Sequence, residues 1–86
     1  MKHRWIEKEN GTIELPPLTA VIEKEDDWFV SRCPELGMAS QGKTKKEAYA
    51  MLAEAVELWL ETASDKEIRR HIRQGADVKP LELAHA

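Results

Sequence analysis

The sequence predicts an α+β fold made of a three-stranded antiparallel meander, an amphipathic helix, a second short helix and a C-terminal strand. Residues 18–41 alternate apolar and polar side chains with the two-residue period of strands. Residues 45–61 then change to the 3.6-residue period of a helix. Capping boxes at Thr44 and Ser64 mark the starts of two helices.

The first segment, residues 3–15, is predicted to form a short hairpin at an edge of the fold, because alternating residues flank the turn signal Asn10-Gly11. Pro16-Pro17 then interrupts strand pairing, since neither residue has an N–H group to donate. The meander follows, with strands at 18–23, 28–33 and 38–41, an acidic turn at 25–27 and a corner at 34–37.

The long helix is predicted to begin at Thr44, whose side chain can accept a hydrogen bond from the amide of Glu47 while the Glu47 side chain reaches back. Gly42 allows a sharp entry into this helix. Its apolar residues recur at helical spacing, so one face is expected to pack on the sheet and the other to face water. The predicted apolar stripe comprises Ala48, Met51, Leu52, Ala55, Val56, Trp59 and Leu60.

The second helix has only Ile68 and Ile72 on its apolar side and is predicted to end at Gly75 in a left-handed cap. Residues 77–83 then alternate again, and Pro80 favours an edge position. The tail is therefore predicted to return to the sheet as a last strand.

The length supports one domain, residues 1–86, with its core in 18–61 and a short helix plus edge strand in 64–86. A domain of this size buries only roughly 60–65% of its unfolded surface, so self-association into a homo-oligomer is expected. The net charge of −3 argues mildly against a protein that grips phosphate backbones.

The single cysteine, Cys33, excludes an internal disulfide and a cysteine-rich zinc site. The N-terminal segment is charged and lacks the apolar core of a signal peptide. No run approaches the ~18 apolar residues of a membrane span. We therefore expect a cytoplasmic protein without membrane association.

No catalytic, metal-binding or cofactor-binding pattern is recognisable. His3, His71 and His85 are scattered, and no two of them have the spacing of helical metal ligands. Neither a nucleophile elbow nor a phosphate-cradling glycine loop is present in the sequence. We expect no enzyme activity, no metal and no cofactor.

Acidic residues crowd at 23–27, where a solvated turn is favoured over a catalytic or magnesium site. Trp59 is predicted to lie in the core, whereas Trp5 and Trp28 either belong to an interface or cover a thin core. The helix dipole accounts for the basic cluster of the second helix more simply than nucleic-acid contact does. That cluster comprises Lys66, Arg69, Arg70, His71 and Arg73. These features favour a small binding or assembly module.

Residues 19–61 resemble the HicB-like antitoxin family in the order and spacing of several short motifs, which together cover about half of the chain. The usual small residue before the aromatic-Val pair is replaced by Trp28. The matching motifs are Ala-Val-Ile-Glu at 20–23, the acidic turn, Phe29-Val30, Pro34-Glu35-Leu36, Gln41-Gly42-x-Thr44, Glu47-Ala48, Glu54-Ala55 and Leu-Trp-Leu-Glu at 58–61.

The resemblance implies a partial ribonuclease-H-like fold with a three-stranded sheet, a helix and a final strand. It also implies a partner: a small basic HicA-type toxin that cleaves mRNA and whose catalytic histidine and RNA-binding surface the antitoxin covers. The separated carboxylates of an active ribonuclease H are not recognisable here. Many family members append a DNA-binding domain, but after Glu61 this chain has room for one helix and one strand only. Direct DNA binding is therefore not expected.

We predict that acidic and aromatic residues contact this toxin, because carboxylates complement a basic RNA-binding site. The predicted partner-binding residues are Glu25, Asp26, Asp27, Trp28 and Glu35. The alternative is a stand-alone homo-oligomeric assembly or small-ligand-binding module without a toxin partner. A residual nuclease that uses the acidic turn with magnesium is the least favoured interpretation.

Overall fold

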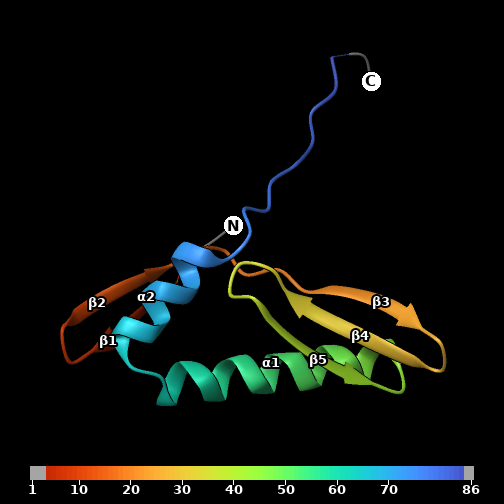
Figure 1. Ribbon diagram of the computed structural model, residues 1–86, viewed down its shortest axis with the longest axis horizontal. Helices are drawn as coiled ribbons and strands as arrows, with labels where there is room; N and C mark the ends of the chain where they lie inside the picture. The colour runs from red at the N-terminus through yellow and green to blue at the C-terminus, as the bar shows by residue number, and fades with distance from the viewer. Residues whose placement is uncertain (1–3, 85–86) are drawn as a thin grey trace.

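The computed structural model describes residues 4–84, which form an α+β fold with two antiparallel sheets and two helices (Figure 1). This confirms the predicted fold class. The elements are β1 (Arg4–Lys8), β2 (Gly11–Leu15), β3 (Val21–Glu25), β4 (Trp28–Cys33), β5 (Met38–Gly42), α1 (Lys45–Thr62) and α2 (Asp65–Gln74).

The predicted N-terminal hairpin is present as the antiparallel pair β1–β2, which forms a two-stranded sheet of its own. Lys8 pairs with Gly11, so Glu9 and Asn10 are the central residues of the turn. Gly11 has a φ of +114°, which L-residues rarely adopt, and this explains the glycine. The hairpin buries Ile13 on the same side as α2, instead of extending the larger sheet.

The predicted meander is the three-stranded sheet β3-β4-β5, in which each neighbouring pair is antiparallel. Asp26 and Asp27 connect β3 to β4, and Asp26 has a φ of 53°. Aspartate is among the few residues other than glycine that tolerate this left-handed conformation. The two aspartates therefore form the turn between β3 and β4, and no glycine is needed there.

Helix α1 is fixed against one face of this sheet at its N-terminal end. Ser31 is fully buried, and its hydroxyl donates a 2.7 Å hydrogen bond to the carbonyl of Ala48. A Cβ atom on Gly42 would lie 2.5 Å from the Ala48 nitrogen, so the contact requires glycine. Thr44 caps the helix as predicted, whereas Glu47 accepts its hydrogen bond from the Lys43 amide, one residue before the cap.

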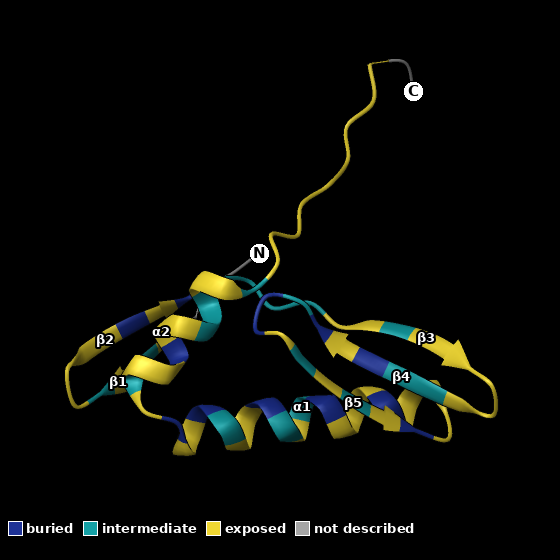
Figure 2. Cartoon of the chain, in the orientation of Figure 1, coloured by how far each residue is buried: buried dark blue, intermediate teal, exposed yellow. Residues whose placement is uncertain are grey.

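The core lies where the β1–β2 hairpin, the corner after β4 and the two helices meet (Figure 2). The buried α1 residues follow a narrow line of four-residue steps. Met51 lies outside this line and is 45% exposed, so its predicted place in the core is wrong. Trp59 packs on the core, while Trp5 and Trp28 are exposed. The core comprises Ile13, Leu15, Cys33, Leu36, Leu52, Val56, Leu60, Ala63 and Ile68.

Helix α2 has the complete capping box predicted at Ser64, but it does not end in a left-handed cap. Gly75 has an extended backbone with a φ of −69°. A Cβ atom there would lie 1.8 Å from the carbonyl oxygen of Glu35, so close backbone contact, and not a positive φ, requires the glycine. Ala76 then donates its amide to the carbonyl of Pro34 at 2.9 Å.

The predicted C-terminal strand does not form in the described part of the tail, which ends at residue 84. After the Ala76–Pro34 hydrogen bond the chain runs away from both sheets (Figure 1). Leu81 is 87% exposed, and Pro80 has no amide to donate to a neighbouring strand. The alternating pattern alone therefore does not produce a strand, because a strand also needs an edge to pair with, and the described part of the tail pairs with none.

Candidate functional site

The turn between β3 and β4 brings together four of the five predicted partner-binding residues: Glu25, Asp26, Asp27 and Trp28. We refer to Glu23–Asp27 together with Trp28 as the acidic hairpin. All of its side chains are exposed, and Trp28 retains 43% of its accessible surface. The acidic hairpin lies at one end of the molecule, whereas α2 lies in the opposite half, beside the β1–β2 hairpin that forms the other end (Figure 1).

Few neighbouring cations neutralise the acidic hairpin. Glu25 lies 3.6 Å from Arg32, but both side chains are more than half exposed, so water screens this pair. The Lys43 ammonium lies 6.0 Å from the centre of the Trp28 ring, at the limit of a cation–π contact. Within residues 4–84, Asp26 and Asp27 have no ion pair. The turn therefore presents unpaired negative charge.

The acidic hairpin continues into a sheet face that no helix covers in the described structure. Residues paired directly across antiparallel strands share one face, so the register places Glu23 beside Val30 and Val21 beside Arg32 on the same side as Trp28. α1 packs against the opposite face, as the Ser31 hydrogen bond shows. Exposed tryptophan and valine mixed with charge is a composition typical of protein interfaces.

The fifth predicted residue, Glu35, does not belong to this surface. It is only 7% exposed and lies in the corner after β4, whereas the acidic hairpin is at the start of that strand. Thr19 donates its amide to one carboxylate oxygen at 2.9 Å and its hydroxyl to the other at 2.5 Å. The Cys33 sulfur lies 3.6 Å from the first of these oxygens. The assignment of Glu35 as a partner-contacting residue is therefore corrected: it joins two segments of its own chain.

These contacts set the acid–base properties of both groups. Desolvation raises the pKa of Glu35, but the hydrogen bonds from Thr19 and Cys33 outweigh it and hold the pKa below the ordinary 4.5. Burial, together with the nearby Glu35 charge, raises the pKa of the Cys33 thiol above 9.0. Cys33 is therefore a protonated, buried thiol, and not a nucleophile.

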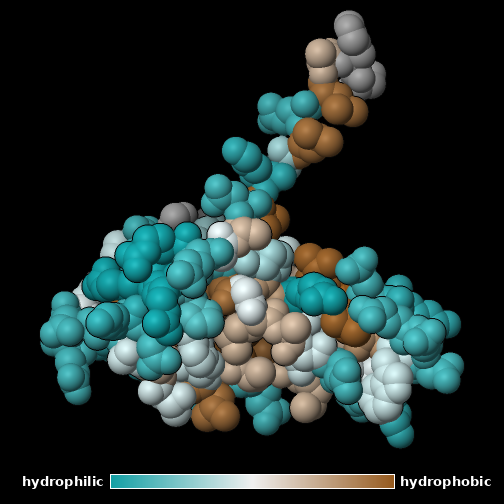
Figure 3. Space-filling view, in the orientation of Figure 1, coloured by the Kyte–Doolittle hydropathy of each residue, from teal (hydrophilic) through white to brown (hydrophobic). Residues whose placement is uncertain are grey.

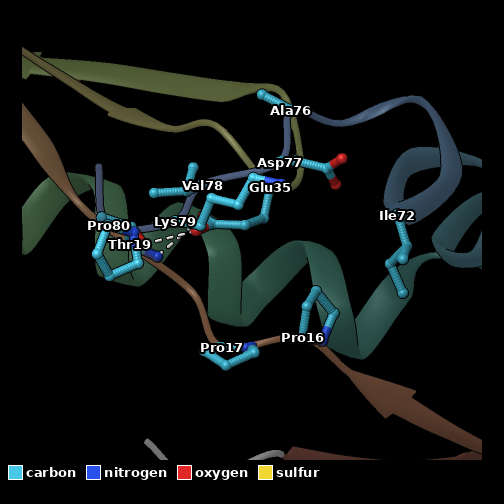
Figure 4. Close-up of a pocket in the computed structure, with 10 residues that line it drawn as sticks. All are labelled: Pro16, Pro17, Thr19, Glu35, Ile72, Ala76, Asp77, Val78, Lys79 and Pro80. Carbon is cyan, nitrogen blue, oxygen red and sulfur yellow. Dashed lines mark hydrogen bonds between the residues drawn. The ribbon is translucent and has the colours of Figure 1, made fainter. Parts of the chain in front are cut away.

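An open groove of about 640 Å³ lies between the start of the tail and the segment before β3, and Glu35 forms part of its wall (Figure 4). Both oxygens of Glu35 accept hydrogen bonds from Thr19, which hold the carboxylate in place within this wall. In residues 4–84 no group of three His, Cys, Asp or Glu side chains could hold a metal ion. The lining residues are Pro16, Pro17, Thr19, Glu35, Ile72, Ala76, Asp77, Val78, Lys79 and Pro80.

The basic cluster of α2 divides into an inner histidine and an outer group of cations. His71 is partly buried, donates from Nδ1 to the carbonyl of Leu36 at 2.8 Å and packs 4.7 Å from Trp59, measured between ring centres. His3 and His85 lie outside the described residues. The cations that remain exposed are Lys66, Arg69, Arg70 and Arg73.

Helical spacing could have separated these residues in the sequence, since His71 follows the inner Ile68 by three positions. No sequence pattern predicts the hydrogen bonds between Thr19 and Glu35, because the two residues are 16 positions apart in unlike segments.

The chain folds as a small α+β domain. It belongs to a family of unknown function, DUF7387, whose family model matches residues 17–81. The match includes the meander, both helices and the first part of the tail, but not the β1–β2 hairpin. A UPF0150 protein from Helicobacter pylori strain J99 is 34% identical over 70 residues, which cover 80% of this chain and 97% of the relative. No solved structure matches the chain. Neither described helix is long and apolar enough to cross a membrane.

Proposed function

We propose that this protein is an antitoxin-like inhibitor that binds a small basic toxin of the HicA type, which cleaves mRNA, and masks its active site. One observation carries the proposal: unpaired carboxylates and an exposed tryptophan adjoin an uncovered sheet face. An RNA-cleaving protein must present cations where its substrate binds, and an acidic surface complements them. The resemblance of residues 19–61 to HicB-like antitoxins supports the same partner class.

The proposed mechanism needs no chemistry from the inhibitor. Asp26 and Asp27 attract the basic surface of the toxin and accelerate encounter. Trp28 supplies a large, rigid apolar contact of the kind that dominates interface energies. Glu35 supports the corner after β4 from inside the fold and does not contact the toxin. In this proposal the pair acts in the cytoplasm, where mRNA is cleaved.

The experiment that tests the proposal is a pull-down from the native host with tagged protein, followed by assays of the eluate for a small basic protein and for RNase activity. The double variant Asp26→Lys, Asp27→Lys should weaken the complex by at least ~10-fold, since close charge pairs across interfaces contribute more than about 1.4 kcal/mol. The matched control is Glu54→Lys, Glu57→Lys, which reverses two exposed charges on α1. A basic RNase that binds both variants and the wild type equally would remove the acidic hairpin from the interface.

The second candidate function is a homo-oligomeric assembly or small-ligand module with no toxin partner. The groove of about 640 Å³ beside the tail favours it, because small-molecule sites have volumes of this order. In that case the protein would be recovered from its host as a discrete oligomer, and no basic RNase would accompany it.

A further inference from the structure

The exposed face of α2 carries a basic stripe, which we define as Lys66, Arg69, Arg70 and Arg73. Their spacing of three, four and seven positions from the first residue aligns them along one side of the helix. All four side chains are exposed, and within the described residues none of them forms an ion pair. The apolar side of the same helix, with Ile68, faces the core.

Helix stability explains the basic stripe only in part: Asp65 and Glu67 precede Arg69 and Arg70 at helical spacing, but Lys66 and Arg73 have no such acidic residue before them. Like charges three or four positions apart repel, and the stripe contains such pairs throughout its length. The helix dipole favours cations only in the last turn, where Arg73 stands. Lys66 is in the first turn, where the dipole opposes a positive charge. The exposed cations of the stripe are therefore available to an anionic partner outside the helix.

The acidic hairpin carries the complementary charge at the far end of the same chain. The molecule extends 42 Å along its longest axis; the acidic hairpin lies at one end of that axis and α2 lies in the opposite half (Figure 1). They cannot contact each other within one chain. Figure 3 shows hydrophilic side chains gathered over α2 and over β3–β4 on the same face, with less polar surface between them.

We propose that two copies of this protein associate about a two-fold axis, with the basic stripe of each copy against the acidic hairpin of the other. An antiparallel placement of two identical faces brings each complementary pair together twice and closes the assembly. The less polar surface between the charged ends then becomes the centre of the interface. Charged residues at the rim and apolar residues at the centre are the usual anatomy of such contacts.

A second copy fits the stripe better than a nucleic acid does. The acidic hairpin offers four carboxylates, at Glu23, Glu25, Asp26 and Asp27, to four cations. The whole chain carries a net charge of −3, which repels a polyphosphate but leaves a local pairing of opposite charges favourable. Self-association also buries surface that a domain of this size exposes.

The test uses two charge-reversal variants of the full chain. The hairpin variant is Asp26→Lys, Asp27→Lys, and the stripe variant is Arg69→Glu, Arg70→Glu. Sedimentation velocity should show a wild-type dimer and at least ~10-fold weaker self-association for either variant alone, because each variant cancels the net charge of one of the two complementary regions in both contacts. An equimolar mixture should restore the dimer: the introduced lysines of one variant meet the introduced glutamates of the other, and the two unchanged regions meet each other.

The mixture distinguishes a specific contact from damage to the fold, since two misfolded variants would not restore a dimer. Circular dichroism checks each variant, and the control Glu54→Lys, Glu57→Lys should dimerise as the wild type does. A monomeric wild type, variants that dimerise normally, or a mixture that stays monomeric would each overturn the inference. It would equally be overturned if the stripe variant kept its dimer and lost only binding to a fluorescein-labelled DNA duplex.

This inference does not rest on the proposed function, because it is measured on the purified protein alone. The toxin and the second copy would occupy the same acidic hairpin, so they would bind as alternatives. A failed dimer test leaves the toxin proposal standing, and the absence of a toxin leaves the dimer testable.

Discussion

At the scale of single residues, the least expected feature is a buried carboxylate that stays ionised. Glu35 is 7% exposed, yet hydrogen bonds from Thr19 and Cys33 stabilise its charged form. A buried charge is tolerated only when hydrogen bonds replace the water it loses. Glu35 thereby connects the corner after β4 to the segment that enters β3.

Replacing this carboxylate should destabilise the protein in a pH-dependent manner. Glu35→Gln replaces one oxygen by an amino group facing donors, so we expect a loss of about 1–3 kcal/mol of unfolding free energy at pH 7. The folded pKa of Glu35 lies below 4.5, so its contribution is present above that pH and disappears as pH falls through the folded value. The difference between wild type and variant should therefore shrink below pH 4.5.

Urea unfolding at a series of pH values measures this difference directly. Glu57→Gln is the control, since it removes an exposed carboxylate on α1 and should change stability by less than about 0.5 kcal/mol. A Glu35→Gln variant as stable as the wild type at pH 7 would show that the Thr19 hydrogen bonds contribute nothing net.

The thiol next to Glu35 gives a second prediction. Cys33 is 2% exposed, and its pKa is raised by burial and by the Glu35 charge. Native protein at pH 8 should react with a thiol reagent at least ~100-fold more slowly than protein unfolded in guanidinium, because only the accessible thiolate reacts. Absorbance after addition of an aromatic disulfide reagent gives both rates. Equal rates would contradict the burial of Cys33.

At the scale of elements, two glycines determine how α2 and the corner before β5 are placed. Gly75 lies against the backbone of Glu35, and the following amide bonds Pro34. Gly37 instead has open space around its Cα but a φ of +67°. One glycine is needed for close contact and the other for its backbone conformation.

Alanine substitutions should separate these two causes. Gly75→Ala places a methyl group 1.8 Å from the Glu35 carbonyl oxygen, so α2 must shift, and we expect a loss of about 3 kcal/mol or more. Gly37→Ala meets no atom within 4 Å and should cost about 1–2 kcal/mol from the left-handed backbone alone. Urea unfolding compares the two variants. A smaller loss at Gly75 than at Gly37 would be evidence against the close packing of α2 on the corner.

The elements that the sequence predicted correctly depend on neighbours in the chain. Caps at Thr44 and Ser64, the turn at Asp26-Asp27 and the two helices all arise from residues within a few positions of one another. Where a structural feature depends on contacts between distant segments, the sequence pattern did not predict it correctly. The described tail alternates like a strand but pairs with no strand. Gly75 caps α2 as predicted, but with an extended backbone packed against Glu35 in place of the left-handed conformation.

The partner-binding residues, like the elements, could be predicted only where they are neighbours in the sequence. Glu25 to Trp28 are adjacent in sequence, so their grouping could be predicted, whereas Glu35 was assigned to the surface by its charge alone. Its burial depends on Thr19, 16 positions away. Charge in a sequence indicates the chemistry of a side chain but not the direction in which the fold turns it.

At the scale of the whole molecule, the net charge of −3 is unevenly distributed: negative charge gathers at the acidic hairpin and positive charge at the basic stripe. Contacts between exposed charges weaken with salt, because the screening length falls from about 10 Å at 0.1 M to about 3 Å at 1 M. A dimer held at its ends by these charges should therefore dissociate more readily as sodium chloride rises. Burial of apolar surface is not screened by salt, so this part of the interface should not weaken in the same way.

Sedimentation equilibrium of the wild type at 0.05 M and 0.5 M sodium chloride should show a dimer dissociation constant that increases at least ~10-fold. In the mixture of hairpin and stripe variants, one contact keeps the wild-type charges and the other exchanges them at the substituted positions, so its dissociation constant should also rise with salt. The pair Glu54→Lys, Glu57→Lys changes net charge without touching either end and should leave the salt dependence unaltered. A wild-type dimer that tightens with salt would assign its stability to the less polar centre, and the charged ends would then select only the orientation of the two copies.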